Sequence, residues 1–168
     1  LSCHCSIVVR KGIVGSFFKS FKGLLPFNFK EAFQGPLFFQ VFGELQREDT
    51  ALSAFLKAKK EGKPITLTET TAQSSFKSGQ RDFVYAGDLA EAVCLILEKG
   101  KLGEIYNVAS GKTNTMQEIA ETMHSEVVWI PRRPYEVSVH HGNIEKLKGL
   151  GWETKVNVLQ WLKNVGSV

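Results

Sequence analysis

Short apolar runs alternate with longer amphipathic stretches through most of the chain, and this alternation limits the possible folds more than any other feature. Runs rich in β-branched and aromatic side chains predict strands at residues 36–42, 65–68, 82–85, 104–108 and 127–130. The helical spacing of apolar residues, together with capping residues, predicts helices at residues 50–61, 89–99, 115–123, 144–148 and 158–165. Strands that alternate with helices indicate an α/β protein. The elements are too few for a complete doubly wound domain with its own cofactor site.

The chain has two compositional regimes. Residues 1–40 contain five basic side chains and one acidic side chain, which accounts for the whole formal charge of +4. Nine of the twelve phenylalanines lie at or before Phe42. Residues 6–14 could form a strand, because Ile7, Val8 and Val9 are β-branched, whereas residues 15–33 show no sustained helical or strand period. We therefore divide the chain into a basic, Phe-rich segment, residues 1–35, and an α/β lobe, residues 36–168.

Composition also predicts the compartment and argues against a metal site. No apolar run reaches the roughly 18 residues that a membrane span needs, and the first residues do not follow the order of a signal peptide. We expect a cytoplasmic protein without a membrane partner. Three cysteines make no disulfide framework, and residues 3–5 (Cys-His-Cys) lack a second ligand pair at a metal-site spacing. Cys94, in an apolar helical stretch, is expected to be a buried thiol.

Arg81 stands beside a predicted buried strand, and this placement has two explanations. The first is an ion pair with Asp82 or Asp88, which is common at the rim of a fold. The second is a bidentate contact with a phosphate, for which the planar guanidinium is suited. The residue types alone leave both open.

Five segments in order resemble motifs of one enzyme family. They are Phe-Phe-Gln-Val-Phe-Gly-Glu (38–44), Arg-Asp-Phe-Val-Tyr with Asp-Leu-Ala-Glu-Ala (81–92), Gly-Glu-Ile-Tyr-Asn-Val-Ala-Ser-Gly (103–111), Arg-Pro-Tyr-Glu (133–136) and Leu-Gly-Trp (150–152). These segments resemble the extended short-chain dehydrogenase/reductase enzymes that act on nucleotide sugars, including UDP-glucose 4-epimerases, dTDP-glucose dehydratases and UDP-glucuronate decarboxylases. The resemblance implies a partial NAD(P)-binding Rossmann-like fold of the extended type, mainly its substrate-binding lobe.

The resemblance also implies a ligand site. Arg81 and Arg133 would hold the pyrophosphate of a UDP- or dTDP-linked sugar, by charge-assisted bidentate bonds. Gln40 stands where the family has a substrate-binding Asn, and Glu136 stands at an Asp that accepts a hydrogen bond from a ribose or sugar hydroxyl. The segment that faces the nucleotide would begin around Leu67.

The sequence departs from the family in its cofactor and catalytic motifs. It contains no Gly-x-x-Gly-x-x-Gly loop after a first strand and no Tyr-x-x-x-Lys pair. The residues four positions after the three tyrosines are Leu89, Ser110 and Val139. NAD is the family's cofactor, but we do not expect this chain alone to bind it, and we assign no catalytic residue.

Three functions remain open at this point. The first is the nucleotide-sugar-binding portion of a UDP-glucose 4-epimerase-like NAD-dependent epimerase/dehydratase, inactive alone. The second is a non-catalytic nucleotide-sugar-binding or scaffold remnant, with a homodimer left open. The third, a nucleic-acid binder through residues 1–40, ranks lowest because its lysines form no helical stripe. Without the family's cofactor lobe, one face of Phe38, Phe39 and Phe42 is expected to lack cover.

Overall fold

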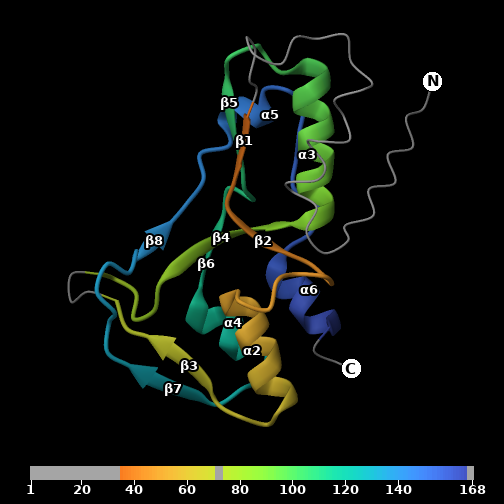
Figure 1. Cartoon of the computed structure of the whole chain (residues 1–168). Helices are drawn as coiled ribbons and strands as arrows, with labels where there is room; N and C mark the ends of the chain where they lie inside the picture. Colours follow the sequence, from red (N-terminus) through yellow and green to blue (C-terminus); the bar gives the residue numbers. More distant parts are fainter. Residues whose placement is uncertain (1–34, 71–73, 166–168) are drawn as a thin grey trace.

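The computed structural model describes residues 35–70 and 74–165 (Figure 1). The interpretation of the basic, Phe-rich segment and of Cys3-His4-Cys5 therefore lies outside the described residues, apart from Gly35. No helix in the described ranges combines the length and the apolar character of a membrane span.

A sheet of four strands forms the centre of the described chain, and β4, Gln80–Tyr85, is its middle strand. One edge of β4 pairs antiparallel with β6, Thr113–Thr115, at residues 80–82. The other edge pairs in parallel with two strands in succession. These are β8, Val139–His140, beside Gln80 and Arg81, and β2, Gln40–Phe42, beside Phe83 to Tyr85. Tertiary pairing along β4 explains why β6 and β8, which are short and polar, carry no sequence signal.

Two separate parallel pairs flank this sheet. In the upper part of Figure 1, β1, Gly35–Phe38, pairs with β5, Ile105–Val108. In the lower part, β3, Ile65–Thr68, pairs with β7, Val127–Ile130. The predicted strands 65–68 and 127–130 are confirmed at both ends.

The helices begin and end close to their sequence signals. They are α2, Ala51–Lys60; α3, Ala86–Lys99; α4, Met116–Thr122; α5, Glu145–Lys148; and α6, Val158–Val165. Thr50 caps α2 by accepting a hydrogen bond from the Ser53 amide (3.2 Å). Thr115 opens α4 with a complete capping box, as its spacing to Glu118 predicts. The Asn157 side chain accepts from two amides of α6.

Three boundaries predicted from the sequence are wrong. The strand predicted at residues 82–85 begins at Gln80, so Arg81 lies within it. Residues 36–42 are not one strand: the chain breaks at Phe39 because β1 and β2 pair with different strands, β5 and β4. The helix predicted at residues 89–99 begins three residues earlier, after Tyr85, so Asp88 lies inside α3 and does not cap it. The Asp88 carboxylate is engaged elsewhere, by the segment that precedes α6.

The described residues form two hydrophobic clusters that meet at β4. Phe83 belongs to the lower cluster, with α2, α4, α6 and the β3–β7 pair. Val84 belongs to the upper cluster, with α3, α5 and β5. Neighbouring residues of a strand point to opposite faces, so one strand serves both clusters. Trp152, 3% exposed, lies in the upper cluster.

The apolar face around β1 is only partly as expected. Phe38 is 44% exposed and Phe39 is half-buried, whereas Phe42 is buried in the lower cluster against Phe83 and Trp161. The expectation of an uncovered Phe42 is therefore wrong. The break at Phe39 explains the difference, because it directs Phe42 into another sheet than Phe38.

Candidate functional site

Arg81 is the second residue of β4 and lies between β6 and β8, opposite Asn114 and His140. Its side chain is 18% exposed, and Nη1 donates a hydrogen bond to the Gln80 carbonyl (2.8 Å). A Cβ at Gly79 would lie 2.9 Å from Nη1, so the guanidinium packs where a glycine leaves room. Burial lowers the pKa of Arg81 from its usual value, and the nearby Glu136 carboxylate opposes that shift. The result is a partly desolvated cation.

Glu136 is the acidic side chain that Arg81 faces. The distance from Arg81 Nη2 to Glu136 Oε1 is 3.9 Å, which is an ion pair but too long for a hydrogen bond. The alternative pairs with Asp82 and Asp88 are not formed, because the hydrogen bonds of those two carboxylates go to other groups. The structure therefore brings together two of the four predicted site residues.

A tight turn presents Glu136. The Glu136 amide donates to the Arg133 carbonyl (3.4 Å), Pro134 occupies the second position and Tyr135 the third, with φ of 62°. Pro at the second position and positive φ at the third are the pattern of a type II turn, which favours Gly at the third. Tyr135 is 98% exposed and so gains little from packing in return for this conformation. The turn explains the spacing of the Arg-Pro-Tyr-Glu segment.

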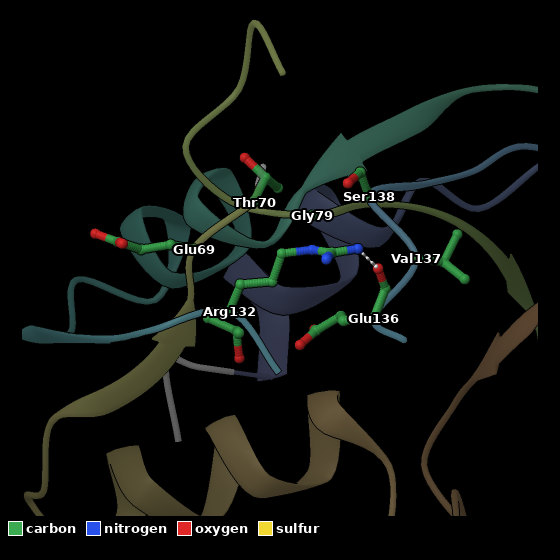
Figure 2. Close-up of a pocket in the computed structure, with 8 residues that line it drawn as sticks. Glu69, Thr70, Gly79, Arg132, Glu136, Val137 and Ser138 are labelled. Atoms are coloured by element: carbon green, nitrogen blue, oxygen red, sulfur yellow. Dashed lines mark hydrogen bonds between the residues drawn. The ribbon is translucent and has the colours of Figure 1, made fainter. Parts of the chain in front are cut away.

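A small depression lies beside this turn, with an empty volume of about 160 Å³ (Figure 2). Its lining residues are Thr68, Glu69, Thr70, Gly79, Arg132, Glu136, Val137 and Ser138. Figure 2 shows Arg132 reaching across the depression, where Nη2 donates to the Glu136 backbone carbonyl (2.7 Å). Leu67 itself is buried, and the residues that follow it line the depression.

The other two predicted residues lie apart from this contact. Arg133 belongs to the turn, but its side chain is exposed and has no ion-pair partner within residues 35–70 and 74–165. Gln40 opens β2 and pairs with Phe83, two residues along β4 from Arg81. Its side chain makes no hydrogen bond to Arg81, Arg133 or Glu136 in the described structure. The geometry thus joins Arg81 to Glu136, and it shows no contact of the Arg133 or Gln40 side chain with either of them in the described structure.

Asp82 supports the site from the inside, and sequence reasoning missed this role. Its side chain is fully buried. Oδ1 accepts hydrogen bonds from the amide and the hydroxyl of Ser110 (both 2.7 Å), and Oδ2 accepts from the amides of Gly111 (3.1 Å) and Gly142 (3.2 Å). Asp82 therefore fixes the start of β4 to the turn after β5 and to the chain after β8. An aspartate at the start of the strand predicted at residues 82–85, directly before three aromatic or apolar residues, was the available signal.

Asp88 makes a second buried anchor. Its Oδ2 accepts from the Thr154 hydroxyl (3.0 Å) and from the amides of Lys155 (2.8 Å) and Val156 (3.0 Å). The Asp88 carbonyl also accepts from the Trp152 indole (3.2 Å). The first turn of α3 is thereby tied to the segment that leads into α6.

Glu44 joins the loop after β2 to α6. It accepts hydrogen bonds from the Trp161 indole (3.1 Å) and from the Tyr85 hydroxyl (3.0 Å to Oε2). The bond from Trp161 is the main reason that the pKa of Glu44 lies below its usual value. Burial, followed by the bond to Glu44, raises the pKa of Tyr85. Tyr85 is thus held as a neutral donor in a structural contact.

The described residues do not suit the pyrophosphate of NAD. The best candidate is the N-terminus of α3, which follows a parallel strand directly, an arrangement that can bind phosphate. Here the Tyr85 ring covers the first turn, since a Cβ at Gly87 would lie 2.8 Å from that ring, and Glu44 adds a carboxylate beside it. We assign no NAD site to these residues. No group of three potential metal ligands occurs among the described side chains either.

Comparison with known proteins gives this geometry a context. Residues 35–109 match the model of the NAD dependent epimerase/dehydratase family. Among curated proteins, the dTDP-D-glucose 4,6-dehydratase of Bos taurus is 30% identical over 129 residues, which cover 69% of this chain and 35% of that protein. Among solved structures, the UDP-glucose 4-epimerase of Thermus thermophilus in complex with NAD has a TM-score of 0.66 at 27% identity, over 81% of this chain and 46% of that chain.

A second epimerase structure agrees in fold. The UDP-glucose 4-epimerase of Thermotoga maritima with UDP-glucose has a TM-score of 0.67 at 22% identity, over 92% of this chain and 48% of that chain. The chain spans less than half the length of these relatives. The expected fold is confirmed: an α/β arrangement with parallel strands, related to the Rossmann-like extended short-chain dehydrogenases/reductases. Over residues 35–109 the chain matches the NAD-dependent epimerase/dehydratase family, and its fold resembles part of the known epimerase structures.

Proposed function

We propose that this chain binds a UDP- or dTDP-linked sugar through its diphosphate, as the nucleotide-sugar-binding portion of a UDP-glucose 4-epimerase-like enzyme that is inactive alone. One observation carries the proposal: Arg81 is a partly desolvated cation whose ionic partner is a carboxylate 3.9 Å away, too far for a hydrogen bond. A guanidinium in such a setting gains strongly from a charge-assisted bidentate bond to phosphate. The related epimerase structures from Thermus thermophilus and Thermotoga maritima hold NAD and UDP-glucose respectively, which supports a ligand of this class.

The neighbouring residues supply the rest of the proposed site. Arg133 projects from the adjacent turn with a free guanidinium in the described structure, so it can add the second cationic fork. Glu136 can accept a ribose or sugar hydroxyl from the same turn, and Gln40 can donate from the start of β2. The residues after Leu67 lie across the depression, where a nucleoside attached to the diphosphate would extend.

Titration calorimetry with UDP-glucose and dTDP-glucose tests the proposal. Arg81→Ala should weaken binding at least about tenfold, because a bidentate charged contact is lost. Arg81→Lys keeps the charge without the fork and should recover only part of the affinity. Arg47→Ala is the matched control, since it removes an exposed arginine paired with Asp49 away from the depression. Equal affinity of Arg81→Ala and the unaltered chain would refute the assignment.

The alternative is a non-catalytic nucleotide-sugar-binding or scaffold protein. Titration with a nucleotide sugar does not distinguish it from the portion of an enzyme. The absence of both family motifs from these 168 residues supports it as much as it supports an enzyme portion. NAD binding to the purified chain can be measured by fluorescence. A positive result would indicate a complete cofactor site and would contradict both the inactive enzyme portion and the non-catalytic protein. Cytoplasmic location and a homodimer remain predictions.

A further inference from the structure

The Glu136 carboxylate is poorly satisfied in the position it occupies. Oε2 is buried and has no hydrogen-bond partner in the described structure. Oε1 faces Arg81 at 3.9 Å, which leaves this oxygen without a short bond to the guanidinium. A buried carboxylate oxygen without a donor is unfavourable, so another feature must keep the side chain there.

The turn and its neighbour hold Glu136 in place. Arg132 Nη2 bonds the Glu136 carbonyl across the depression, and the Glu136 amide closes the turn onto Arg133. The space that remains, about 160 Å³ including open solvent, contains no enclosed cavity even for a water molecule. The carboxylate therefore stands close to Arg81, in a depression too small for a nucleotide sugar.

We propose that Glu136 is an internal anion that occupies the place of a ligand phosphate beside Arg81, and that a diphosphate binds by displacing it. This inference rests on the proposed function, since it concerns the same site. Two anions cannot share one partly buried guanidinium without strong repulsion, so the incoming phosphate and Glu136 compete. The bond from Arg132 is to the backbone, so the carboxylate can swing away while the turn stays attached. In its displaced position Glu136 is available to a ligand hydroxyl.

Inorganic pyrophosphate is the probe that isolates displacement, because it carries the anion and no hydroxyl of ribose or sugar. Glu136→Gln removes the competing charge at nearly unchanged shape and should tighten pyrophosphate binding about tenfold, within the usual range of coupling between two sites. Glu69→Gln is the matched control: this carboxylate lines the same depression but points away from Glu136 (Figure 2). It should change pyrophosphate affinity by less than about twofold, because an exposed charge is screened. Melting curves of both variants show whether the fold is retained.

The outcomes distinguish the two claims. If folded Glu136→Gln binds pyrophosphate as the unaltered chain does, or more weakly, the displacement is refuted. The proposed function can still hold in that case, provided that the unaltered chain binds UDP-glucose and Arg81→Ala binds it more weakly. Tighter pyrophosphate binding together with weaker UDP-glucose binding supports displacement and adds the hydroxyl contact. Failure of every variant to bind either ligand refutes the proposed function and the displacement together.

Discussion

Asp82 and Asp88 are both buried carboxylates with several donors, yet they should respond differently to the same isosteric change. Asp82 uses both oxygens, two donors on each. All three side-chain bonds of Asp88 converge on Oδ2. An asparagine has one acceptor oxygen and one donor group. Asp88→Asn can therefore keep its bonds by placing its oxygen at the Oδ2 position, whereas Asp82→Asn must turn an amide group toward donors.

The size of the difference follows from the groups left without an acceptor. In either orientation, Asp82→Asn leaves at least one half-buried or buried backbone amide without its acceptor: that of Ser110, or those of Gly111 and Gly142. Each such group costs about 1–3 kcal/mol, and charge assistance is lost as well, so we expect about 2–4 kcal/mol of destabilisation. Asp88→Asn loses charge assistance alone and should cost about 1 kcal/mol. For a chain of this size a difference of about 2 kcal/mol corresponds to roughly 4–8 °C in melting temperature.

Urea unfolding and thermal melts of the two variants measure this directly. The free energy of unfolding should fall in the order unaltered chain, Asp88→Asn, Asp82→Asn. Asp49→Asn, an exposed carboxylate paired with Arg47, supplies the surface reference and should cost less than about 1 kcal/mol. Equal costs for Asp82→Asn and Asp88→Asn, within about 0.5 kcal/mol, would show that the division of donors between the two oxygens does not set stability.

Further predictions concern the turn and the C-terminal helix. Tyr135→Gly should raise the free energy of unfolding by about 1 kcal/mol, because glycine accepts positive φ without strain; a lower melting temperature would contradict this. Glu44→Gln should flatten the acid side of the stability profile. Since folding lowers the pKa of Glu44, its stabilisation is present above the unfolded value near 4.5 and disappears as pH falls through the folded value. Urea unfolding at pH 6 and pH 3 measures it, and parallel profiles would contradict it. Arg132→Ala should speed proteolysis within residues 131–138, and Arg133→Ala should not, since of these two side chains only that of Arg132 bonds within the loop in the described structure.

Local signals predicted most of the elements, and non-local pairing accounts for the errors. The helix at residues 51–60 and the capping box at Thr115 depend on neighbours within four residues, which the sequence displays. The break at Phe39 depends on which strands lie beside β1 and β2, and those partners are more than 40 residues away. The strands β6 and β8 form by pairing with the edges of β4. Their own residues show no alternation of apolar and polar side chains from which a strand could be predicted.

The candidate site shows the same division. The resemblance indicated Arg81 and Glu136, and the structure brings them into contact. The residue types also offered Asp82 as an ion-pair partner for Arg81, but the carboxylate lies inside the fold, bonded to residues 28 and more positions along the chain. Side chains on adjacent positions of a strand point in opposite directions, which separates the two groups. Arg132 was not predicted, because it precedes the Arg-Pro-Tyr-Glu segment to which the resemblance applies.

The shared position of β4 affects how other sequences of this kind can be interpreted. Asp82, Phe83 and Val84 make buried contacts on both faces of β4. A related protein that binds no ligand would therefore still need these three residues for stability. Arg81 is the residue of that segment whose charge we propose to bind a ligand. A related sequence that keeps the Asp-Phe-Val part of this motif but lacks the arginine would therefore be expected to have the same fold. The motif would then give no information about a ligand.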